Sequence, residues 1–154
     1  MTTPIKPVPE ENDAYELQEV LTRYIDSRDG YRKAAEEIEY KALANTMLKI
    51  ASRRNSIAET FSELILAQGY RPDVEGSNEA KFHRWWIHLR AGMTNDEIAA
   101  VIHECLRGET ELQKTLESAQ NDPELLPDHL PLIEVALRDI QETVSDLEAA
   151  DNLS

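Results

Sequence analysis

The 154-residue sequence is poor in residues that interrupt helices or cross-link a chain. It has 5 glycines, 7 prolines and a single cysteine, Cys105, so no disulfide can form within the chain. No apolar run approaches the ~18 residues of a transmembrane helix, and the opening residues MTTPIKPVPEEND lack the apolar core of a secretory signal. The sequence therefore predicts one all-α domain, located in the cytoplasm, that does not interact with a membrane.

Positive charge is also scarce, since 16 lysines and arginines stand against 30 aspartates and glutamates, for a formal net charge of −14. Nucleic acids and anionic membranes select basic clusters, so neither is expected as a partner, and cations or basic proteins fit better. The sequence contains no glycine-rich phosphate loop, nucleophile elbow or recognisable acid–base pair. We therefore expect a non-catalytic protein rather than an enzyme.

Apolar periodicity predicts four long helices in a single domain over residues 12–150, preceded by a flexible, proline-containing tail at residues 1–11. The first two helices are separated by a change of phase near residues 39–41, and Gly69 ends the second. The sequence pattern gives no support for β-strands. The apolar stripes of the first two helices consist of Leu17, Leu21, Tyr24, Tyr31, Ala35 and Ile38, then Leu43, Met47, Ile50, Ile57, Phe61 and Leu64.

A crossover of about 25 residues, with a short helix from about residue 78, leads to the third helix, where Thr94 and Glu97 have capping-box spacing. Such a long connection leaves the second and third helices parallel, which predicts a ferritin-like four-helix bundle. The third helix has the stripe Ile98, Ile102, Cys105, Leu112, Leu116 and Ala119. After the connector NDPELLPDHLP, the fourth has the uninterrupted stripe Ile133, Leu137, Ile140, Val144 and Leu147.

Three charged residues occupy positions where these stripes demand apolar side chains: Arg28, Arg54 and Glu109. Antiparallel packing of the first two helices would place Arg28 opposite Arg54, and helical rise brings Glu109 to within about a turn of Arg54. We predict a central Arg54–Glu109 pair with Arg28 close by and Tyr24 or Tyr31 as a further partner. The group could be a structural network or a pocket for an anion or small polar ligand.

Two glycines, Gly30 and Gly108, lie inside helices near this level, where each costs about 1 kcal/mol relative to alanine. Close approach of a neighbouring group would explain them, and so would a kink that opens a ligand site.

Several short patterns carry a family resemblance: Gly30-Tyr31 with Ala34-Ala35-Glu36, Arg53-Arg54, Gly69, Gly76-Ser77, His83-Arg84 with Trp86, Glu104-Cys105 and Gly108-Glu109. With these patterns the chain resembles bacterial ferritin-like four-helix-bundle proteins of uncharacterised function, a domain-of-unknown-function family. The resemblance covers roughly residues 12–149. It implies the bundle fold and, by analogy alone, an association with stress.

The metal chemistry of ferritin-like bundles is not expected in this chain. Di-iron bundles use glutamates and Glu-x-x-His motifs, and the sequence has no Glu-x-x-His. Relatives in the resembled group place histidine where this chain has Val144. We expect no cofactor. Iron or manganese binding in a redox or iron-handling protein is the alternative, with Glu36, Glu104 and Glu109 as first candidates for ligands.

The segment FHRWWIHLR is the best candidate for an interaction surface, formed by His83, Arg84, Trp85 and Trp86. Its other interpretation is an amphipathic helix that packs Phe82, Trp86 and Leu89 over the bundle. An outward-facing Trp85 would favour a homodimer or other homo-oligomer, or another protein partner, over nucleic acid. Cys105 is expected to be a small buried apolar residue. The leading hypothesis is a protein that works through binding or assembly.

Overall fold

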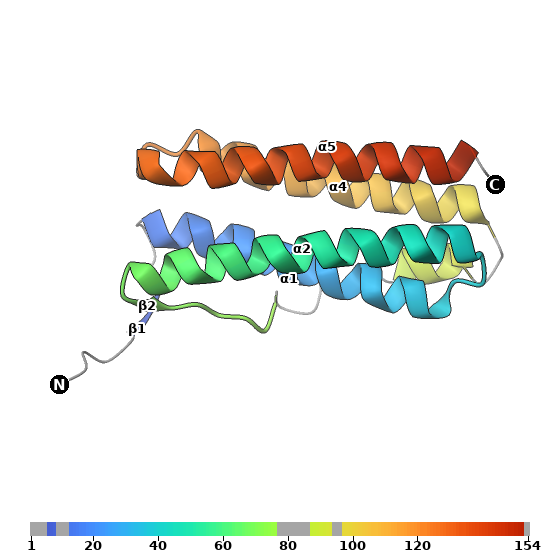
Figure 1. Cartoon of the computed structure of the whole chain (residues 1–154), viewed down its shortest axis with the longest axis horizontal. Coiled ribbons are helices and arrows are strands. Elements are labelled where there is room, and N and C mark those ends of the chain that lie inside the picture. Colours follow the sequence, from blue (N-terminus) through green and yellow to red (C-terminus); the bar gives the residue numbers. More distant parts are fainter. Residues whose placement is uncertain (1–5, 9–12, 77–86, 94–96, 153–154) are drawn as a thin grey trace.

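The computed structural model of the protein describes residues 6–8, 13–76, 87–93 and 97–152. Four long helices account for most of them: α1 (Asp13–Glu37), α2 (Lys41–Ala67), α4 (Ile98–Gln120) and α5 (Leu130–Asn152). The helices lie side by side with their axes roughly aligned (Figure 1), and residues 87–93 add a short helical segment. The all-α prediction is confirmed. None of the helices in the described ranges is long and apolar enough to cross a membrane.

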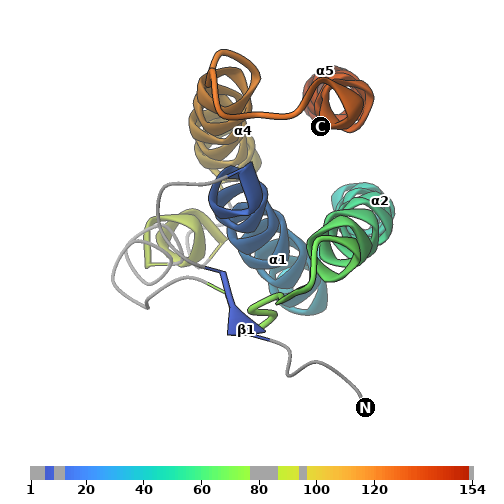
Figure 2. The ribbon, with the colours of Figure 1, turned by 90° about the vertical axis from the view of Figure 1, so that its left-hand side faces the viewer.

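The helix directions follow the lengths of the connections. Residues 38–40 join α1 to an antiparallel α2, which ends beside Gly69, a residue with a left-handed φ of 89°. The colours of Figure 1 show α4 running in the same direction as α2, and α5 running with α1. Seen end-on, neighbouring helices follow the order α1, α2, α5, α4 around the molecule, with the most extensive packing between α1 and α2 (Figure 2).

The start of α4 differs from the prediction. The helix begins at Ile98 with Glu97 at its N-cap, and Glu97 makes no capping hydrogen bond through its side chain. Thr94, the expected partner in a capping box, lies outside the described residues. At the other end of the C-terminal helix pair, a short 3₁₀ turn, η1 (Pro127–His129), leads directly into α5.

The expectation that the chain contains no strands is wrong near the N-terminus. β1 (Lys6–Pro7) pairs in parallel with β2 (Tyr70–Arg71), with Lys6 opposite Tyr70, and Val8 packs against the apolar core. Part of the predicted tail is therefore attached to the domain just after α2. Strands of two residues are too short to leave a periodic pattern in the sequence.

The core consists of two apolar clusters with a polar layer between them. Along every long helix the buried apolar residues divide into two groups, and a buried charge stands at the division on α2, at Arg54, and on α4, at Glu109. On α5 the buried polar residues Asp139 and Thr143 lie near the same division. The helices thus carry these side chains to one level in the middle of the molecule.

Candidate functional site

Arg54 connects all four long helices through one buried guanidinium group. Its Nη1 donates to Ser27 Oγ on α1 at 2.9 Å and to Glu109 Oε2 on α4 at 3.2 Å, and its Nη2 donates to Glu109 Oε1. Nη2 also donates to Thr143 Oγ1 on α5 at 2.9 Å. The Nε lies 2.7 Å from Asp139 Oδ2, an ion pair whose N–H direction falls short of a hydrogen bond. The carboxylates of Glu109 and Asp139 therefore both bind the guanidinium group of Arg54.

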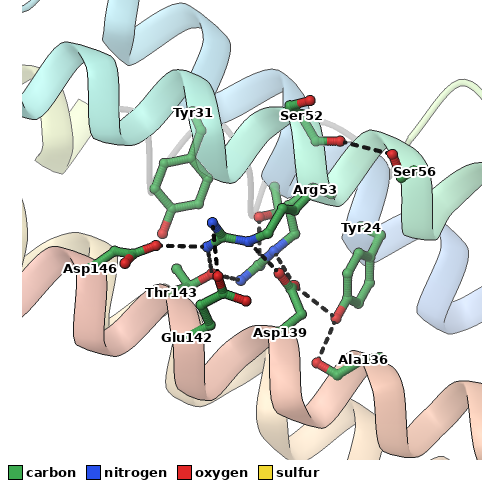
Figure 3. Close-up of polar contacts among 12 residues, drawn as sticks. Tyr24, Tyr31, Ser52, Arg53, Ser56, Ala136, Asp139, Glu142, Thr143 and Asp146 are labelled. Carbon is green, nitrogen blue, oxygen red and sulfur yellow. Dashed lines mark hydrogen bonds and ion pairs between the residues drawn. The ribbon is translucent and has the colours of Figure 1, made fainter.

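The neighbouring Arg53 reaches the same layer from its half-exposed edge. Its Nε donates to Asp139 Oδ1 at 3.1 Å and its Nη2 donates to Thr143 Oγ1 at 3.0 Å. Nη2 also lies 3.1 Å from Asp146, and Nη1 lies 3.7 Å from Glu142 (Figure 3). Consecutive arginines on α2 therefore share the two oxygens of Asp139.

The buried layer is balanced in charge because Arg53 and Arg54 face the carboxylates of Glu109 and Asp139. Burial acts to lower the pKa of Arg54, but the two carboxylates more than offset it and raise that pKa above its ordinary value. Arg54 is therefore a permanent cation in the core. Mutual neutralisation explains how the fold tolerates charges that would otherwise be costly to desolvate.

Two tyrosines on α1 complete the layer and take different partners. Tyr31 Oη donates to Glu109 Oε2 at 2.8 Å, while Tyr24 Oη lies 3.1 Å from the Ala136 carbonyl oxygen and 3.4 Å from an oxygen of Asp139. Burial raises the pKa of both phenols far above the ordinary value, so both keep their protons. Arg54 Cζ lies 5.3 Å from the Tyr24 ring centroid and 6.0 Å from that of Tyr31, within cation–π range.

A cavity of about 570 Å³ lies between α1 and α4, beside this network. Tyr31, Cys105, Glu109 and Leu112 line it and are themselves buried, so they form its floor. Gly108 also lines the cavity and contributes no side chain to fill it. The remaining described lining residues are more polar: Arg23, Asp26, Ser27, His88, Glu104, Arg107, Glu111 and Thr115.

The family described as Domain of unknown function (DUF2383) matches residues 13–122 of the chain. The chain belongs to this family. The match covers α1, α2 and α4, so Arg54 and Glu109 lie within it, whereas α5 with Asp139 lies beyond it. Neither a curated protein nor a solved structure matches the sequence. Membership in DUF2383 agrees with the predicted domain of unknown function and assigns no activity.

The structure places three of the predicted site residues as expected: Arg54 and Glu109 form the predicted pair, and Tyr31 is the further partner of Glu109. Tyr24 joins the network through Asp139 instead. Arg28 lies at the edge of this network and makes its own contacts outside it. Its half-exposed side chain donates to Asp29 Oδ1 at 2.9 Å and to Asn55 Oδ1 at 3.1 Å, because the rotation of α1 turns Ser27 rather than Arg28 toward Arg54.

Sequence reasoning missed the contribution of α5 to the network. The predicted stripe ran through Leu137 and Val144, which are only half-buried, whereas Asp139 and Thr143 are buried. A signal was present, because Ala136, Ile140, Leu147 and Ala150 define a face with helical spacing that also includes the two polar residues. Arg53, whose partners are on α5, was missed for the same reason.

The fallback metal ligands do not converge. Glu36 is exposed on α1, Glu104 binds Arg107 Nη2 at 2.9 Å, and Glu109 is bound by Arg54. Within the described ranges, no group of three or more histidine, cysteine, aspartate or glutamate side chains could hold a metal ion. The described side chains therefore do not fit a di-iron centre.

The predicted interaction surface, His83, Arg84, Trp85 and Trp86, falls outside the described residues and stays a prediction. Nearby, Leu89 is buried in the core, as the packed interpretation of this segment expected for that residue. Cys105 is also buried as predicted, and burial together with the charge of Glu109 raises the pKa of its thiol well above the ordinary value.

Proposed function

We propose that this DUF2383 member is a non-catalytic binding protein that holds a small polar ligand in the cavity between α1 and α4. The observation that supports the proposal is the cavity's position. It reaches Glu109 and Ser27, which bind Arg54 directly, and Tyr31, which donates to Glu109, so the ligand would lie against the central charge network. A protein that works only by assembly would have a filled centre instead.

The size and lining of the cavity support this proposal. A volume of about 570 Å³ falls within the range of roughly 300–1,000 Å³ typical of small-molecule sites. Leu112 and the Tyr31 ring offer apolar surface, and Ser27 and Thr115 offer hydroxyl groups. Arg54 fixes the wall behind the ligand because it ties Glu109 to α1, α2 and α5. Such a wall is pre-organised, which reduces the entropic cost of binding.

Binding fits the cavity better than catalysis. Cys105 and Tyr31 are the candidate nucleophile and proton donor on its floor, and burial raises the pKa of each well above neutrality. Neither group would exchange a proton readily at physiological pH. Glu109 already accepts hydrogen bonds from Arg54 and Tyr31, so it is poorly placed to act as a general base.

The ferritin-like part of the proposal rests on connectivity. The parallel course of α2 and α4, with a long connection between them, is the arrangement expected of a ferritin-like bundle with one crossover. In this proposal the level of the core that holds metal ligands in di-iron bundles holds Arg54 with its two carboxylates. A guanidinium group then supplies the central positive charge from within the chain.

Cys105 provides a direct test because it is the only cysteine of the chain and lines the cavity. A fragment library is screened for compounds that raise the melting temperature, and each hit is tested for its effect on the reaction of Cys105 with N-ethylmaleimide. Because Cys105 is buried, N-ethylmaleimide reaches its thiol only when this region opens. A ligand that stabilises the closed cavity should therefore slow alkylation about tenfold when present at ten times its dissociation constant.

Matched variants on α4 complete this test. Thr115 lines the cavity and Thr110 is exposed, and both hydroxyls donate only to a carbonyl one turn earlier in the helix. Thr115→Phe should fill the cavity and abolish both protection and stabilisation by the hits, whereas Thr110→Phe should leave them intact. The proposal fails if no compound protects Cys105, or if the two variants respond alike.

A further inference from the structure

Arg23 stands out among the charged residues that line the cavity. It is half-buried on α1, one turn before Ser27, and among the described interactions it makes neither a hydrogen bond nor an ion pair. By contrast, Arg107 on the opposite wall donates to Glu104 through Nε at 3.1 Å and Nη2 at 2.9 Å. One cavity wall therefore presents a guanidinium group whose hydrogen-bonding capacity is unused.

The carboxylates around the cavity are already engaged. Glu109 is bound by Arg54, Glu104 by Arg107, and Glu111 lies 3.3 Å from Lys114 Nζ. Asp26 likewise has a partner, and that partner is not Arg23. Among the charged side chains that the structure describes in this lining, Arg23 is thus the one left without a partner, even though the protein as a whole is strongly acidic.

We propose that the cavity binds a small organic anion whose carboxylate or phosphate group is held by Arg23. This inference rests on the proposed function and adds the chemical class of the ligand. The guanidinium fork matches two oxygens of either group, and partial burial strengthens such charge-assisted hydrogen bonds. The apolar part of the anion packs on Leu112 and the Tyr31 ring, deeper in the cavity.

Four small phenyl compounds that differ in their polar group test this assignment: benzoate, phenyl phosphate, benzamide and benzylamine. Dissociation constants are measured by ligand-observed NMR on the full chain. Loss of a charge-assisted hydrogen bond weakens binding about tenfold, so benzamide should bind about tenfold more weakly than benzoate. The preference between benzoate and phenyl phosphate identifies which anionic group the site takes.

Two arginine variants on α1 localise the effect. Arg23→Gln should weaken benzoate or phenyl phosphate about tenfold and leave benzamide unchanged. Arg32→Gln is the control, because Arg32 is exposed on the same helix and does not line the cavity. It should bind all four probes as the wild type does.

The outcomes separate this inference from the proposed function. If fragments protect Cys105 but neither anion binds, or benzamide or benzylamine binds as tightly as the anions, the inference is wrong and the proposed function stands. If Arg23→Gln leaves anion binding unchanged, the inference is likewise wrong and the proposed function stands. If no fragment protects Cys105, both fail together.

Discussion

Replacing Arg54 with methionine should lower the free energy of unfolding by about 3–5 kcal/mol, because it leaves two buried carboxylates facing each other without their common cation. Glu109 and Asp139 are 3% and 5% exposed, so water can replace little of the interaction that either carboxylate loses. Ser27 and Thr143 also lose the donor that binds them. Urea denaturation followed by circular dichroism measures the loss.

The neighbouring arginine provides the control for this prediction. Arg53 is 26% exposed, its partners Glu142 and Asp146 are at the surface, and its buried partner Asp139 keeps Arg54, so Arg53→Met should cost only about 1 kcal/mol. Equal losses in the two variants would contradict a central role for Arg54.

Replacing Glu109 with leucine should cost about 3–5 kcal/mol, and the double variant Arg54→Met/Glu109→Leu should be more stable than Glu109→Leu alone. The single change leaves Arg54 with Asp139 as its one carboxylate partner and removes the acceptor of Tyr31 Oη. In the double variant the buried charge is removed together with its partner, and Asp139 keeps Arg53 at 3.1 Å.

A double-mutant cycle on Arg54 and Glu109 measures this coupling. Residues in one buried network show coupling energies of about 0.5–3 kcal/mol, and the two single losses should sum to well above the loss in the double variant. Strictly additive losses would mean that the pair does not act as a unit, and the structural account of the charged layer would be wrong.

The parts of the fold that sequence could predict are those with a long-range pattern. The helices repeat their apolar positions over six or more turns, and a charge such as Arg54 is conspicuous against that repeat. The assumption of antiparallel packing then predicted which residue of α1 faces Arg54, with an error of one position. That single position separates Ser27, which is in the network, from Arg28, which is at its edge.

Asp139, Thr143 and the cavity were harder to predict, for different reasons. On α5, Leu137 and Val144 offered an apolar stripe next to the true one, and about 100° of rotation separates successive residues of a helix. The cavity depends on the spacing of two helices that are distant in sequence, which no local pattern encodes. Gly108 was the available signal, because it lines the cavity.

We expect Arg54, rather than a metal ion, to neutralise the buried carboxylates of Glu109 and Asp139. Metal content per chain tests it most directly, measured after anaerobic loading with Fe(II) or Mn(II) and removal of excess metal, with Glu109→Ala for comparison. We expect no tightly held metal in either protein and a less stable Glu109→Ala variant. Stoichiometric metal in the wild type that disappears in Glu109→Ala would contradict it and make metal chemistry the working mechanism.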